Sequence, residues 1–122
     1  MKYSDLTEGM REALTSAISK RLLKLGINTE VSIFAKKIYD GREMVHVETA
    51  PFNSTPVIYK RIFVMGDGFI EPTDREGIYE IAFLLGYRFE YFSGGENGVD
   101  IGSITFRIFE KTGDLTCLGL NI

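Results

Sequence analysis

Apolar side chains recur every three or four positions near the start of the chain. This period is typical of an amphipathic α-helix with one buried stripe. Asp5 followed by Glu8 has the spacing of a capping box, and Gly26 supplies the left-handed residue that often ends a helix. We therefore predict a helix over residues 5–25, with a stripe formed by Leu6, Met10, Leu14, Ala17, Ile18, Leu22 and Leu25.

Alternating apolar and polar positions follow this helix. Residues 29–39 and 42–50 flank Asp40-Gly41, a residue pair that favours a two-residue β-hairpin turn. A loop over 51–56 has a proline at each end, and a third strand is expected over 57–65, ended by the glycines of 66–68. The pattern thus predicts three strands in succession.

The apolar spacing then returns to a helical period. Thr73 and Glu76 fit a second capping box, and Ile78, Ile81, Ala82 and Leu85 fall on one face. We predict a second helix over 74–85, ended by Gly86.

Three further strands are expected over 87–92, 99–110 and 115–122. The glycine-rich loop at 94–98 lies between two of them, with Asn97-Gly98 as its turn pair. A phosphate-binding loop would lead into a helix, and no Gly-Lys-Ser/Thr sequence is present, so we interpret the loop as a hairpin connection.

These elements predict a single α+β domain over 1–122, with two helices packed on a mostly antiparallel sheet. The predicted order is α-β-β-β-α-β-β-β. The two matching halves raise the hypothesis of an αβββ duplication.

The predicted strands carry apolar residues on both faces. In 57–65 one face holds Ile58, Ile62 and Val64, and the other holds Tyr59, Phe63 and Met65. Two helices can cover only one face of six strands, and a large exposed apolar patch is unusual for a monomer. We expect the second face to be covered by a second copy, by a partner protein, or by the sheet curling upon itself.

Composition narrows the class of protein. The 122 residues have a net charge of −3 and one cysteine, Cys117, so no internal disulfide can form. The charged first residues lack the apolar core of a signal peptide, and no apolar run is long enough for a membrane span. We expect a cytoplasmic protein that does not interact with membranes.

Little in the sequence indicates catalysis. His46 is the only histidine, it lies in a predicted strand, and no nucleophile motif accompanies it. One cysteine and one histidine are too few for a structural zinc site, and the acids of 67–76 do not have the spacing of a calcium loop. We therefore assign no catalytic residue, no metal and no cofactor, and consider the chain more typical of a non-enzyme.

Charge is distributed unevenly between the two halves. Residues 1–61 hold 10 Lys and Arg against 7 Asp and Glu, whereas residues 62–122 hold 4 against 10. A nucleic-acid-binding domain using this basic half is one alternative. The acidic 73–76 segment would repel phosphate, and the sequence pI near 5.2 argues against that alternative.

The leading functional hypothesis is a protein-binding or adaptor domain, of the chaperone, inhibitor or immunity type found in bacteria and their mobile elements. It would act through an aromatic sheet face, as a homodimer. Aromatic and arginine side chains dominate protein interfaces, so the candidate residues are Tyr59, Arg61, Phe63, Phe89, Tyr91 and Arg107. The remaining alternative is an enzyme or small-ligand binder with a pocket between helices and sheet, lined by His46, Arg61 and acids.

Overall fold

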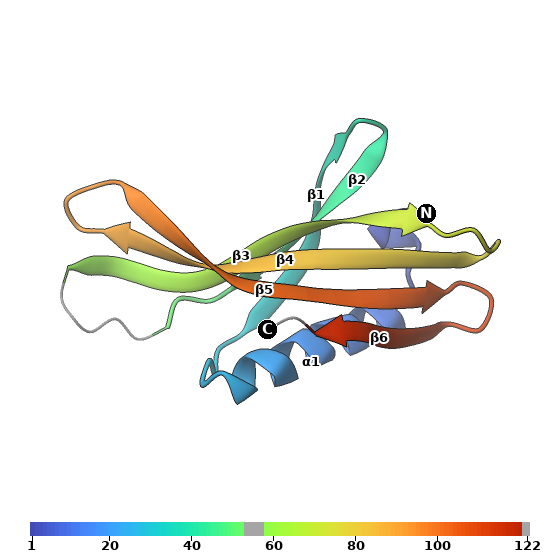
Figure 1. Ribbon diagram of the computed structural model, residues 1–122, viewed down its shortest axis with the longest axis horizontal. Coiled ribbons are helices and arrows are strands. Elements are labelled where there is room, and N and C mark those ends of the chain that lie inside the picture. The colour runs from blue at the N-terminus through green and yellow to red at the C-terminus, as the bar shows by residue number, and fades with distance from the viewer. Residues whose placement is uncertain (53–57, 121–122) are drawn as a thin grey trace.

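A computed structural model describes residues 1–52 and 58–120. Its six strands form one sheet in the order β1-β2-β3-β4-β5-β6, and every neighbouring pair is antiparallel. The sheet accompanies a single α-helix among the described residues (Figure 1). The elements are η1 (Tyr3–Asp5), α1 (Glu8–Lys24), β1 (Val31–Tyr39), β2 (Arg42–Thr49), β3 (Tyr59–Pro72), β4 (Ile78–Tyr91), β5 (Glu96–Phe109) and β6 (Asp114–Leu120).

The predicted first helix is present but begins three residues later than expected. Its buried side chains are Met10, Leu14, Ile18 and Leu22, each one turn apart. The N-cap is Thr7, whose Oγ1 accepts a hydrogen bond from the Met10 backbone N–H. The prediction of an Asp5–Glu8 capping box is therefore wrong, because residues 3–5 form a separate 3₁₀ turn.

The predicted second helix is wrong. Residues 78–91 form the strand β4, so the α-β-β-β-α-β-β-β order and the duplication that it implied are also wrong. An alternation of period two runs over 81–85, with Ile81, Phe83 and Leu85 buried between exposed Ala82 and Leu84. Pairing with β3 on one side and β5 on the other gives every residue a partner strand, which a short helix would not have.

Thr73 serves a turn rather than a helix cap. Its Oγ1 donates to the Ile78 carbonyl oxygen at 2.8 Å and accepts from the Arg75 N–H at 3.2 Å. Ser and Thr side chains favour both helix N-termini and turns because they satisfy nearby backbone groups in either setting. The same residue type therefore closes the β3–β4 hairpin.

Two of the predicted hairpin connections are present. Asp40 and Gly41 form the β1–β2 turn with φ of 53° and 74°, as the sequence predicts for this pair. The 94–98 region also joins two strands, but its turn uses Gly94 and Gly95, both with positive φ. The prediction that Asn97 and Gly98 form the turn is wrong, since both residues lie in β5 and pair with residues of β4.

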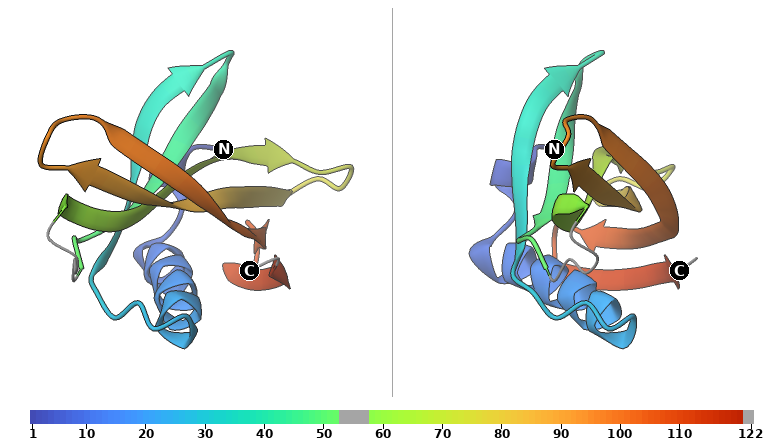
Figure 2. Two further views of the ribbon diagram at one scale, coloured as in Figure 1. Left: turned by 60° about the vertical axis from the view of Figure 1, so that its left-hand side comes forward. Right: turned by 90° about the vertical axis from the view of Figure 1, so that its left-hand side faces the viewer.

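The sheet coils around α1. β1 and β6, the two edge strands, both contact the helix, and Figure 2 shows the strands curling around it. Gly66 and Gly68, expected to end the third strand, lie inside β3 where the sheet bends. A Cβ at Gly66 would collide with the Leu84 carbonyl oxygen. A Cβ at Gly68 would lie 2.5 Å from the Ala82 carbonyl oxygen. Glycine thus allows β3 and β4 to approach closely at the bend.

The core lies between α1 and the concave face of the sheet, here called the helix face. The opposite face is the outer face. Strand side chains buried in this core include Val45, Val47, Val64, Ile70, Ile81, Phe83, Leu85, Ile104, Phe106 and Ile108. The predicted 51–56 loop falls largely on residues 53–57, outside the described part of the chain.

Candidate protein-binding surface

Five aromatic rings form a continuous row on the helix face. The ring centroids of Phe52 and Tyr87 are 6.3 Å apart, those of Tyr87 and Phe89 6.0 Å, those of Phe89 and Tyr59 5.1 Å, and those of Tyr59 and Tyr91 5.2 Å. Aromatic pairs at these separations attract one another and hold the rings in place. We call these five residues the aromatic shelf.

The shelf begins at the core and extends away from it. Tyr87 packs against the buried core, and Phe89 and Tyr91 follow it at alternate positions of β4, so they lie on the same face. The ends of β3 and β4 extend past the C-terminal end of α1 (Figure 1). Tyr59, Phe89 and Tyr91 are half-buried there, because the helix does not reach over them.

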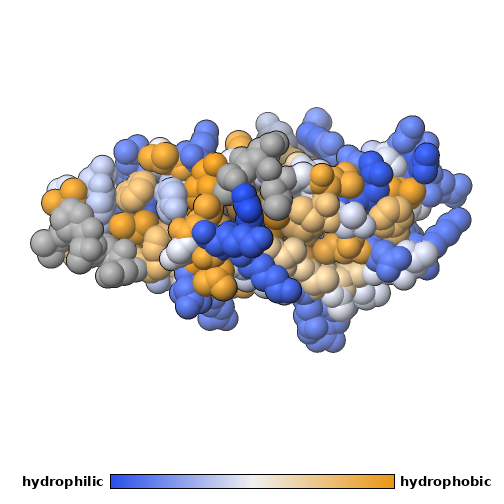
Figure 3. Space-filling model, turned by 60° about the horizontal axis from the view of Figure 1, so that its bottom comes forward, coloured by the Kyte–Doolittle hydropathy of each residue, from blue (hydrophilic) through white to orange (hydrophobic). Residues whose placement is uncertain are grey.

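Exposed apolar residues adjoin the shelf. Val99 lies opposite Tyr87 in the β4–β5 ladder and is 52% exposed, and Phe92, next to Tyr91, is 66% exposed. The Phe92 N–H donates to the Ile58 carbonyl oxygen, which places exposed Ile58 beside it. Figure 3, viewed from the α1 side, shows apolar atoms interspersed with polar ones over this end of the molecule.

The six residues predicted from sequence do not form one surface. Tyr59, Phe89 and Tyr91 lie on the shelf, whereas Arg61 and Phe63 lie on the outer face. A bulge at Lys60 causes the split, since Tyr59 pairs with Tyr91 and Arg61 with the adjacent Glu90. One extra residue turns the preceding side chain to the other side of a strand.

Arg61 and Phe63 form a compact polar and aromatic unit on the outer face. The Arg61 guanidinium lies 4.5 Å from the Phe63 ring centroid and donates to both carboxylate oxygens of Glu90, at 2.8 and 2.6 Å. This paired hydrogen bonding holds the pKa of Glu90 below its usual value and raises the pKa of Arg61. Phe63 is almost fully buried beneath this arrangement.

Arg107 lies toward the other end of the outer face. It donates to Glu80 Oε1 from Nη2 at 2.8 Å, across the β4–β5 ladder. Arg42 pairs with Glu71, and Arg88 lies 3.4 Å from Glu96. The outer face therefore carries a series of cross-strand ion pairs rather than one apolar patch.

His46 is buried on the outer face between two carboxylates. Its Nδ1 lies 2.7 Å from Asp67 Oδ1 and its Nε2 lies 3.2 Å from Glu48 Oε1. The Phe34 ring packs on the imidazole at 5.2 Å between centroids, and the histidine side chain is only 3% exposed. His46 thus lies away from the helix–sheet interface, and so does Arg61, although both were expected to line a pocket there.

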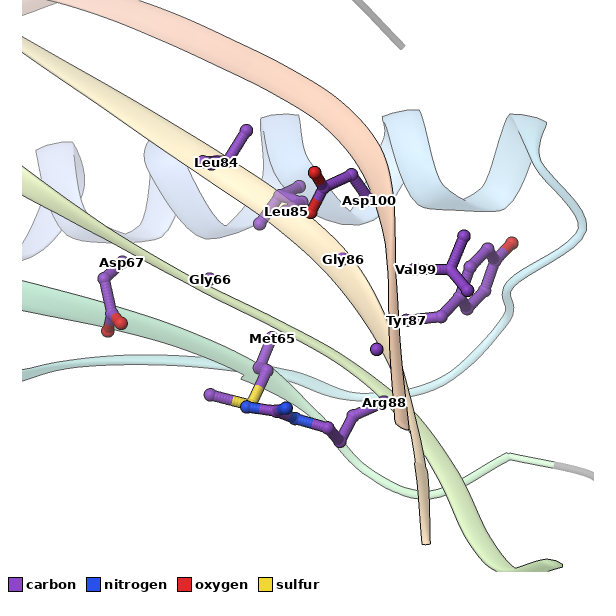
Figure 4. Close-up of a pocket in the computed structure, with 11 residues that line it drawn as sticks. Met65, Gly66, Asp67, Leu84, Leu85, Gly86, Tyr87, Arg88, Val99 and Asp100 are labelled. Atoms are coloured by element: carbon purple, nitrogen blue, oxygen red, sulfur yellow. The ribbon is translucent and has the colours of Figure 1, made fainter. Parts of the chain in front are cut away.

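A shallow pocket of about 390 Å³ lies where β3, β4 and β5 bend across one another. In Figure 4 the side chains of Met65 and Arg88 extend from neighbouring strands toward the same side, and Asp100 comes from β5. Asp67, which also lines the pocket, already pairs with His46. Among the described residues that line it there is no histidine, cysteine, serine or lysine.

Two further features concern metals and membranes. Within residues 1–52 and 58–120, no group of three or more His, Cys, Asp or Glu side chains is arranged to hold a metal ion. None of the helices in the described part of the chain is long and apolar enough to cross a membrane.

Four basic residues of the first half lie on two separate parts of the sheet. Lys36 and Lys37 lie on the projecting β1–β2 hairpin, whereas Lys60 and Arg61 lie at the start of β3 (Figure 1). Arg61 is already paired with Glu90.

Comparisons with protein-family models, with curated proteins and with solved structures find no match to this chain.

Phe52 is a shelf residue that the sequence pattern does not indicate. The proline spacing predicts a loop at Phe52, but its N–H donates to the Ile62 carbonyl oxygen and the residue forms a bridge with Ile62. No local pattern indicates this contact, because it joins residues ten positions apart across a loop. A bulky aromatic residue beside Pro51 was the available signal.

Proposed function

We propose that this protein is a protein-binding domain that uses the aromatic shelf as its docking surface. The observation that carries the proposal is the row of five aromatic rings extending past the end of α1, with its outer members only half-buried. The proposal keeps the adaptor function expected from the sequence and moves it from the outer face to the helix face.

The energetics favour a protein partner over a small ligand. Aromatic side chains bury a large apolar area and lose little rotamer entropy on binding. Here the rings also hold one another in place before any partner arrives, which lowers the cost of binding. An open shelf of this kind suits an extended apolar surface, whereas small ligands are usually held in enclosed cavities.

A photo-crosslinking experiment tests the proposal. Benzoylphenylalanine replaces Tyr91 on the shelf in one variant and exposed Tyr39, on the β1–β2 hairpin, in a matched control. Both variants are irradiated in extract from cells that express the protein. We expect a discrete adduct from the Tyr91 position that is absent from the control and is lost when Phe89→Ser and Tyr59→Ser are added.

The mass of the adduct identifies the class of partner. An adduct at twice the mass of the chain identifies a second copy on the shelf, and any other discrete mass identifies a different protein. The proposal is overturned if the Tyr91 position gives no adduct above the Tyr39 control while the variant remains folded by circular dichroism.

A further inference from the structure

The sheet ends in strand edges with very different chemistry. β1 and β6 are the two terminal strands. Among residues 1–52 and 58–120, β6 pairs with β5 over Ile104–Phe109, and no strand pairs with the first half of β5 on that side, which makes it a third edge. An open edge presents backbone N–H and C=O groups in the spacing that another strand recognises. The side chains along an edge decide whether such pairing is opposed.

Two of these edges are protected by charge or by irregularity. β1 carries Lys36 and Lys37, and a bulge between Ala35 and Lys37 interrupts its ladder. The open half of β5 carries Glu96 and Asp100, which would face like charges in a second copy. Lysines, bulges and acidic side chains on an edge all oppose strand addition.

β6 lacks most of this protection. Over Leu115–Gly119 it has no charged residue and no proline, and Thr116, Cys117 and Leu118 are exposed. It does contain a bulge, because Phe106 pairs with Cys117 while Thr105 pairs with Gly119. The only charged residue of the strand is Asp114, at its first position.

We propose that two copies of this protein associate through their β6 edges, which pair antiparallel about a two-fold axis and join the two sheets. A two-fold axis brings the same strand of each copy into the contact. The outward-facing N–H and C=O groups of the two β6 strands then bond to one another. Antiparallel pairing places the two Asp114 side chains at opposite ends of the contact, whereas parallel pairing would stack them. This charge arrangement favours the antiparallel over the parallel pairing of two copies.

The contact is small, which predicts a dimer that dissociates on dilution. A seven-residue strand buries far less surface than the roughly 1,600 Å² of a standard stable interface. We therefore expect the mass measured by light scattering after size exclusion to rise from one chain to two as the protein concentration increases.

Leu118→Lys tests the edge directly, and Ser32→Lys is the matched control on the β1 edge. Both positions are exposed in strands, so each variant should fold. A lysine at position 118 places an ammonium group of each copy at this small contact, where an edge lysine opposes strand addition, so it should raise the dimer dissociation constant roughly tenfold or more. Ser32→Lys should leave that constant unchanged.

Cys117 provides an independent measurement, because it occupies the middle of β6. Opposed residues of antiparallel strands have Cα atoms about 4.5–5.5 Å apart, within the range of a disulfide. Diamide, which takes up the two thiol hydrogens, should link the dimer through Cys117. In a Cys117→Ser background, a cysteine at Leu115 or Thr116 should link it if the two-fold axis lies there.

The outcomes of these experiments distinguish the β6 dimer from protein binding at the aromatic shelf. A protein that stays monomeric at millimolar concentration overturns the β6 contact. So does a dimer that is dissociated by Phe89→Ser and Tyr59→Ser but not by Leu118→Lys. A β6 dimer that yields no shelf adduct overturns only the proposed function.

Discussion

The Nδ1 atom of His46 lies 2.7 Å from Oδ1 of Asp67, directly across the β2–β3 ladder. Phe34 lies opposite His46 on the other side, in β1. An ionised carboxylate only accepts hydrogen bonds, so Nδ1 donates to Asp67. The histidine thereby joins three strands on the outer face through one buried polar group.

Removal of the Asp67 carboxylate should therefore be costly. Asp67→Ala leaves the buried Nδ1 without its partner, and we expect the free energy of unfolding to fall by about 1–3 kcal/mol. Asp67→Asn should restore most of this loss, because its carbonyl oxygen can accept the same bond. Urea unfolding measures both variants.

Exposed Glu71, which pairs with Arg42, is the control for this experiment. Glu71→Ala should cost less than about 1 kcal/mol, since surface ion pairs contribute little. Equal losses for Asp67→Ala and Glu71→Ala would show that the buried histidine does not depend on its partner.

The bend in β3 should tolerate no side chain at Gly66. A Cβ there meets the Leu84 carbonyl oxygen, which belongs to a paired strand and cannot move aside alone. We expect Gly66→Ala to lower the free energy of unfolding by at least about 3 kcal/mol or to prevent folding. Gly9→Ala is the matched control, because nothing lies within 4 Å of its added Cβ in α1. That change should stabilise the protein by about 0.5–1 kcal/mol, as alanine favours helix.

The sequence was sufficient to predict elements whose apolar period has only one interpretation. The four-residue spacing from Met10 to Leu22 gives a helix, and the Asp40-Gly41 pair gives a hairpin. Residues 78–85 satisfy two periods, because Ile78, Ile81, Ala82 and Leu85 suit a helix while Ile81, Phe83 and Leu85 suit a strand. Long-range pairing with β3 and β5 decides between them, and a local pattern does not contain it.

The sequence predicts only part of the candidate site, because the rest also depends on pairing between strands. Alternation along β4 correctly places Phe89 and Tyr91 on one face. The bulge at Lys60 turns Tyr59 to that face and leaves Phe63 on the other. A bulge depends on the register between two strands, so strict alternation within β3 assigned Tyr59 and Phe63 to the same face.

The N-cap of α1 offers a test of the helix start. Thr7 Oγ1 accepts the Met10 N–H at 3.1 Å, whereas Asp5 accepts the Lys2 N–H in the preceding turn. We expect Thr7→Ala to lower the free energy of unfolding by about 1 kcal/mol. Asp5→Ala should cost less than about 0.5 kcal/mol, since its bond is exposed and lies outside the helix. A larger loss for Asp5→Ala in thermal unfolding would contradict the observed cap.

The Arg61–Glu90 pair should make part of the stability depend on pH. Its hydrogen bonds lower the pKa of Glu90 in the folded protein from the ordinary value of 4.5. Such a group adds stability that is fully present above 4.5 and is lost as the pH falls through the lowered folded value. Glu90→Gln removes this titration, so the variant should lose less stability than the wild type between pH 5 and acid conditions. Urea midpoints across that range measure the difference, with Glu71→Gln as the control for an exposed pair on the same face. If Glu90→Gln and the wild type lose stability in parallel on acidification, the Arg61–Glu90 pair does not persist in solution.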